Sequence, residues 1–131
     1  MKTILDAGPL VALLNRRDAY HGWVTQALRA LDLPLWTCEA VLTEAAHLTG
    51  KPAAILAMVG DGSLKLGLNL EQQGDAVRRL LERYGARMGL ADACVVRMSE
   101  MFRQCRVFTL DRRDFAIYRR HSREVIPLLA P

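Results

Sequence analysis

The sequence has few cysteines and no long apolar segment. Its three cysteines, Cys38, Cys94 and Cys105, form an odd set without C-x-x-C spacing, which argues against a disulfide framework and against a cysteine metal site. No apolar run reaches the roughly 18 residues that a membrane span requires, and Asp6 lies where a secretory signal needs apolar residues. We therefore expect a cytoplasmic protein with reduced, partly buried thiols and no membrane contact.

Length and composition are those of an ordinary folded domain. The chain has 131 residues, of which 51% are hydrophobic and 24% are charged, so we expect one domain over residues 1–131. The formal net charge is +4, and 15 of the 18 basic residues are arginine. Arginine binds phosphate through paired hydrogen bonds, which suits an acidic partner such as nucleic acid. A GC-rich genome would produce the same excess of arginine, so charge alone does not identify the partner.

Short apolar segments that favour strands alternate with longer segments of helical periodicity. We predict strands at residues 2–5, 35–37, 64–66, 106–110 and 125–126, helices at residues 9–15, 21–31, 38–49, 51–59, 70–84 and 90–104, and a short helical turn over residues 115–120. This alternation predicts an α/β protein with a parallel sheet and helices on both of its faces.

Four acidic residues interrupt apolar surroundings in which a solvated acid is out of place: Asp6, Glu44, Asp92 and Asp111. Asp6 and Asp111 follow predicted strands, at the edge where open parallel sheets bind their ligands. Carboxylates that converge there repel one another and need a cation, and oxygen ligands suit Mg²⁺ or Mn²⁺ rather than zinc. For any one of these acids alone, a helix cap or a salt bridge to arginine is the commoner role.

The segments around these acids resemble the PIN domain, in its VapC-like branch. The matching stretches are Ile4 to Leu14, Leu42 to Ala45, Leu90 to Ala93 and Thr109 to Phe115, and they follow the family's order over nearly the whole chain. The resemblance implies a three-layer α/β/α sandwich with a central parallel sheet of four or five short strands. It implies a metal-dependent endoribonuclease that cleaves single-stranded RNA, as the toxin of a toxin–antitoxin pair.

The resemblance also assigns roles to individual residues. It implies that a catalytic, metal-binding quartet is formed by Asp6, Glu44, Asp92 and Asp111, with Mg²⁺ or Mn²⁺ as cofactor. Thr109 matches a hydroxyl beside the pocket, and Asp114 matches a position that some members also use. Arg112 is expected to bind the substrate backbone. Ala7 departs from the family, since many relatives carry Ser or Thr there. The apolar helices of the first half resemble the surface through which relatives form homodimers and bind an antitoxin.

Other functions remain open on the sequence alone. A PIN-fold module could bind RNA or metal without turnover, although an intact quartet argues against that. A nuclease that prefers DNA is compatible with the same metal chemistry, because that chemistry does not require the 2′-hydroxyl. A haloacid-dehalogenase-like phosphatase would need a second aspartate two residues after Asp6, where Gly8 stands. A response-regulator receiver would need paired acids near the first strand, and these are absent.

Overall fold

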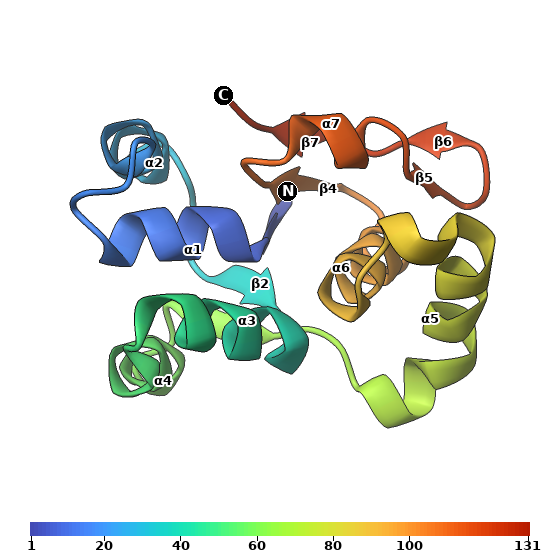
Figure 1. Cartoon of the computed structure of the whole chain (residues 1–131), viewed down its shortest axis with the longest axis horizontal. Helices are drawn as coiled ribbons and strands as arrows, with labels where there is room; N and C mark the ends of the chain where they lie inside the picture. The colour runs from blue at the N-terminus through green and yellow to red at the C-terminus, as the bar shows by residue number, and fades with distance from the viewer.

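Five short strands form the central sheet of the computed structural model, which describes all 131 residues (Figure 1). The strands are β1 (Lys2–Leu5), β2 (Leu35–Thr37), β3 (Leu64–Leu66), β4 (Cys105–Phe108) and β7 (Leu128–Leu129). They are arranged in the order β3-β2-β1-β4-β7, and every pairing is parallel. Ile4 pairs with Trp36 on one side and with Val107 on the other, so β1 is the middle strand. The predicted parallel sheet is confirmed.

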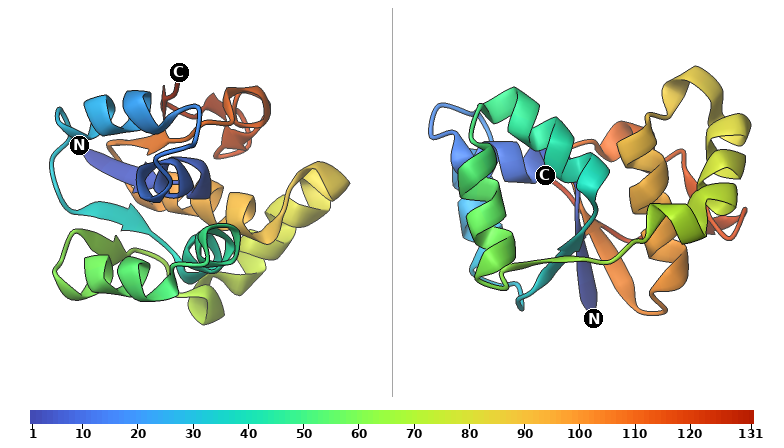
Figure 2. Two further views of the ribbon diagram at one scale, coloured as in Figure 1. Left: turned by 60° about the vertical axis from the view of Figure 1, so that its left-hand side comes forward. Right: turned by 90° about the horizontal axis from the view of Figure 1, so that it is seen from below.

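Helices cover both faces of this sheet, as Figures 1 and 2 show. The helices are α1 (Ala7–Leu14), α2 (His21–Leu28), α3 (Glu39–Thr49), α4 (Pro52–Gly60), α5 (Leu70–Tyr84), α6 (Leu90–Met101) and α7 (Arg112–Phe115), with a short 3-10 helix η1 (Gly85–Arg87). Because successive strand residues point to opposite faces, Ile4 belongs to a core shared with α5 and α6, and Leu5 belongs to a core shared with α1, α2 and α4. The predicted three-layer sandwich is confirmed.

Helix α3 lies against both cores. Val41 belongs to the core on the side of α5 and α6, and its neighbour Leu42 belongs to the core on the side of α1, α2 and α4. The helix begins after Cys38 and ends at Gly50, whose φ of 66° is a left-handed conformation that glycine adopts at little cost. Because both cores fix α3, the solvent-facing side of its middle turn is held over one edge of the sheet.

The C-terminal segment differs from the sequence prediction. The helical turn predicted over residues 115–120 is wrong, because α7 lies earlier, at Arg112–Phe115, where the side chain of Asp111 accepts a hydrogen bond from the backbone N–H of Asp114 (2.9 Å). Residues Arg119–Arg120 instead form β5, which pairs antiparallel with β6 (Glu124–Val125). The terminal sheet strand predicted at 125–126 is wrong as well, since β7 lies three residues later.

Smaller features agree with the sequence prediction in part. The three cysteines are free and buried. None of the helices combines the length and the apolar character that crossing a bilayer demands. Helix α6 ends at Met101 rather than at residue 104, and β4 spans Cys105–Phe108 rather than 106–110.

Candidate active site

The four predicted carboxylates line one hollow at the carboxyl edge of the sheet. The hollow has a volume of about 380 Å³ and is lined by Asp6, Ala7, Gly8, Glu44, Leu48, Asp92, Leu110 and Asp111. Asp6 follows the central strand β1, and Asp111 follows its neighbour β4. Asp92 lies in the first turn of α6, and Glu44 lies in the middle of α3. We call this feature the carboxylate hollow.

Asp6 is the most deeply buried of these acids, with 7% of its surface exposed. Its Oδ1 accepts a hydrogen bond from the backbone N–H of Ala7 (2.9 Å) and so caps α1, and its Oδ2 accepts one from the Thr109 hydroxyl (2.7 Å). Burial raises the pKa of Asp6 from 3.8 to about 6. The two hydrogen bonds oppose this rise, and the charges of Asp92 and Glu44 add to it.

Thr109 connects two of the acids. Its side chain is fully buried, its hydroxyl donates to Asp6, and the same oxygen accepts a hydrogen bond from the backbone N–H of Asp111 (2.9 Å). The hydroxyl therefore sets the position of the Asp6 carboxylate and of the backbone at Asp111. This is the supporting position that the sequence predicts for Thr109, and its role in a reaction stays a prediction.

Asp92 is held by a residue that sequence reasoning missed. The hydroxyl of Tyr118 donates to Asp92 Oδ2 (2.9 Å) and lies 3.1 Å from the carbonyl oxygen of Arg87. Tyr118 is fully buried, and its ring packs edge-on against Tyr84 and Phe115. Burial raises the pKa of Asp92, and the hydrogen bond from Tyr118 opposes that rise. In the sequence, Tyr118 is an aromatic residue within a basic segment, and nothing in that pattern relates it to Asp92.

Two further predicted residues lie outside the hollow's lining. Asp114 forms an ion pair with Arg87 (3.4 Å), and its charge contributes to the raised pKa of Asp92. Arg112 donates hydrogen bonds to the carbonyl oxygens of Ala130 (2.7 Å) and Pro131 (3.3 Å), so its guanidinium contacts the end of the chain. The structure thus does not bring Arg112 to the carboxylates, and its predicted contact with substrate stays a prediction.

The donor set fits a hard divalent cation. The hollow is lined by four carboxylates and by no lysine or arginine, so nothing in its wall neutralises their charge. No three acidic, cysteine or histidine side chains are placed closely enough to hold an ion by themselves. Mg²⁺ commonly binds through one or two carboxylates and completes its shell with water and substrate phosphate. The residues therefore fit an open metal site that substrate would complete.

A groove extends from the carboxylate hollow. A second hollow of about 540 Å³ shares Glu44 and Asp92 with the first and is otherwise lined by Ala40, Thr43, Gly89, Leu90 and Ala91. The two hollows meet between α3 and α6. Together they give an extended ligand such as a nucleotide chain a path past the carboxylates.

The raised pKa of Asp6 predicts how stability varies with pH. Because the folded state binds the proton more tightly than the unfolded state, the contribution of Asp6 to the free energy of unfolding is fully present below about pH 4 and is lost as pH rises through about 6, by up to about 3 kcal/mol. Asp6→Asn should remove this loss and stabilise the protein by about 1–2 kcal/mol at pH 8 but not at pH 4. Urea unfolding in EDTA at both pH values measures the difference.

Asp32→Asn is the control for this prediction, because Asp32 is exposed and makes no hydrogen bond or ion pair with its side chain. Its effect on the free energy of unfolding should be the same at both pH values. An Asp6→Asn effect that is equally independent of pH would show that the Asp6 carboxylate is not destabilised by burial.

Tyr118→Phe should raise the pKa of Asp92 further, because it removes the one side-chain hydrogen bond that stabilises the ionised carboxylate. We also expect a loss of about 1–3 kcal/mol in the free energy of unfolding. Titration of the Asp92 carboxyl carbon by NMR measures the pKa. Tyr84→Phe is the matched control, since the Tyr84 hydroxyl accepts from the backbone N–H of Arg119 and contacts no acid. Equal Asp92 pKa values in the two variants would contradict the prediction.

Comparison with known proteins gives a match at the level of structure. No family model matches the sequence, and no curated protein matches it. Among solved structures, VapC20 of Mycobacterium tuberculosis, a toxin that cleaves the sarcin-ricin loop, is similar with a TM-score of 0.68 at 18% sequence identity. The similarity covers 96% of this chain and 100% of the VapC20 chain. The chain therefore has the fold of the PIN-domain toxin VapC20.

Proposed function

We propose that the chain, as a single PIN domain over residues 1–131, is a metal-dependent endoribonuclease that cleaves single-stranded RNA. The observation that carries the proposal is the convergence of Asp6, Glu44, Asp92 and Asp111 on one hollow at the carboxyl edge of the sheet. The likeness of the fold to a toxin that cleaves RNA supports the choice of reaction. The same likeness supports a role as the toxin of a toxin–antitoxin pair.

The chain's own residues would hold the reacting groups in place. When bound, Mg²⁺ or Mn²⁺ would activate water and stabilise the leaving oxygen of the phosphodiester. Asp6 is oriented by Thr109 and by the start of α1, and Asp92 is oriented by Tyr118. Because these hydrogen bonds fix the two carboxylates before any ligand arrives, little reorganisation would accompany binding of the cation.

The groove between α3 and α6 supports a single strand as substrate. It passes Glu44 and Asp92, where the two hollows meet, and its wall is formed largely by small side chains such as Ala40 and Ala91. An unpaired strand fits such a groove without the second strand of a duplex. The preference for RNA over DNA follows only from the likeness to VapC20, so DNA is the alternative substrate that the experiment must include.

Cleavage assays test the proposal. Labelled single-stranded RNAs of varied sequence, and DNA of matched sequence, would be incubated with Mn²⁺, with Mg²⁺ or with EDTA. We expect metal-dependent cleavage of RNA that Asp6→Asn and Glu44→Gln each reduce by at least about 100-fold. Glu71→Gln is the control, since Glu71 is an exposed acid in the first turn of α5, outside both hollows.

The alternatives give different results in the same assay. RNA binding without cleavage across the whole panel would favour a binding module without turnover. Faster cleavage of DNA than of RNA would overturn the proposed substrate but not the carboxylate site. Cleavage that persists in both variants would remove these residues from the reaction.

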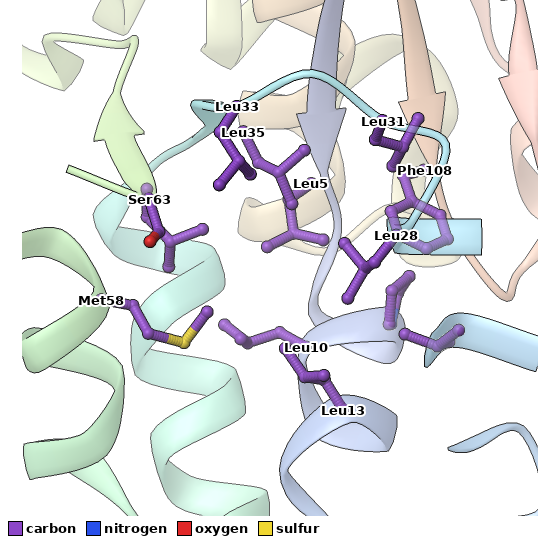
Figure 3. A pocket seen from close by; sticks show the side chains of 13 residues that line it. Leu5, Leu10, Leu13, Leu28, Leu31, Leu33, Leu35, Met58, Ser63 and Phe108 are labelled. Atoms are coloured by element: carbon purple, nitrogen blue, oxygen red, sulfur yellow. The ribbon is translucent and has the colours of Figure 1, made fainter. Parts of the chain in front are cut away.

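The proposal includes a protein partner that binds the face of the sheet covered by α1, α2 and α4. An apolar cavity of about 280 Å³ lies between α1, α2 and α4, with Leu10, Leu28 and Met58 in its wall (Figure 3). A toxin needs an inhibitor, and an apolar segment of an antitoxin suits this cavity. Self-association as a homodimer and a cytoplasmic location stay predictions. Light scattering would distinguish the 14.7 kDa monomer from a dimer.

A further inference from the structure

Helices α5 and α6 and the β5–β6 hairpin lie together in one part of the molecule (Figures 1 and 2). Residues of these elements line a third hollow. It has a volume of about 210 Å³ and shares no residue with the carboxylate hollow. Its polar wall consists of Arg79, Arg83, Arg97, Glu100 and Ser122. We call it the arginine hollow.

The arginine hollow carries unbalanced positive charge. Its one acid, Glu100, forms an ion pair with Arg97 (3.2 Å). Arg83 donates to the carbonyl oxygen of Ser122 (2.8 Å) and has no acidic partner, and Arg79 makes no hydrogen bond or ion pair at all. Arg79 and Arg83 are four residues apart on α5, a spacing at which like charges repel. An anion between them would relieve that repulsion.

The hairpin that closes this hollow has a strained backbone. His121 and Ser122 have φ values of 50° and 67°, a left-handed conformation that side chains other than glycine rarely adopt. Glu100 accepts a hydrogen bond from the backbone N–H of His121 (2.7 Å), and Arg83 donates to Ser122. The residues that line the hollow therefore also hold the strained turn. Positive φ at both residues is what the tight turn between β5 and β6 requires, and the backbone N–H of Arg123 donates to the carbonyl oxygen of Arg120 to close it (3.2 Å).

We propose that the arginine hollow binds a backbone phosphate of RNA outside the segment that is cut, an inference that rests on the proposed function for the identity of the ligand. The carboxylate hollow is negative and repels a polyanion, so attraction for RNA must come from elsewhere on the surface. Guanidinium groups that lack an acidic partner and converge on one hollow suit a phosphate.

The position of the arginine hollow limits what kind of RNA can reach both sites. Asp92 and Arg97 are five residues apart on α6, which corresponds to a rotation of about 140° and an advance of about 7.5 Å. An RNA bound at both hollows must pass around α6 rather than lie straight in the groove. The arginine hollow therefore selects RNA that is long enough or folded suitably to make this second contact.

Fluorescence anisotropy with a labelled single-stranded RNA of about 30 nucleotides, in EDTA to prevent cleavage, tests this inference. Arg79→Gln should raise the Kd about 3- to 10-fold and reduce the slope of log Kd against log salt by about 0.7. Arg78→Gln is the matched control. It changes the net charge equally at the neighbouring position, but Arg78 lies outside the hollow and is paired with Asp75 and Glu82. Its Kd should stay close to that of the wild type.

Equal weakening by Arg78→Gln and Arg79→Gln would show an effect of net charge alone and would overturn the inference. Unchanged binding of RNA in Arg79→Gln would also overturn the inference, as would failure of the wild type to bind RNA. Binding that depends on Arg79 without any cleavage in metal would overturn the proposed nuclease and leave the phosphate site standing.

Discussion

The arrangement of the site depends on one buried carboxylate at the end of the central strand. Asp6 follows β1, caps α1 with one oxygen and accepts the Thr109 hydroxyl with the other. Thr109 follows β4, and its hydroxyl oxygen also accepts a hydrogen bond from the backbone N–H of Asp111. The side chains of Asp6 and Thr109 therefore connect β1 and β4 to the helices that follow them, α1 and α7. The interaction has a cost, since burial raises the pKa of Asp6 to about 6. A protein selected only for stability would place an uncharged residue there.

Charge is separated on this molecule to a degree that its net charge of +4 does not reveal. Four of the 14 acids line the hollow where two parallel strands end, and no basic side chain lines it. The excess of arginine lies in residues 101–131, which hold seven arginines against three acids, whereas α5 and α6 together carry four arginines and five acids. The C-terminal segment would attract a polyanion and the carboxylate hollow would repel it, and a divalent cation in the hollow would offset that repulsion.

The sequence predicts the sheet and the quartet because both rest on local patterns. Ile4 and Leu5 form an apolar run, and an acid directly after such a run marks the edge of a parallel sheet. Tyr118 could not be found in this way, since its partner Asp92 is 26 residues away and only the fold brings them together. The last strand was misplaced because residues 125–126 and 128–129 are equally apolar. Val125 is exposed and pairs with Arg119 in the hairpin, Ile126 is buried in the core, and β7 forms from Leu128–Leu129.

The carboxylates differ in depth, and this difference orders their roles. Asp6 is nearly inaccessible, Asp92 and Asp111 are partly exposed, and Glu44 on α3 is exposed. A divalent cation, if bound, would therefore have Glu44 as its most solvent-exposed ligand and Asp6 as its least exposed one. The deeper acids are held by hydrogen bonds from Thr109 and Tyr118, so binding of a cation would require little movement of their side chains.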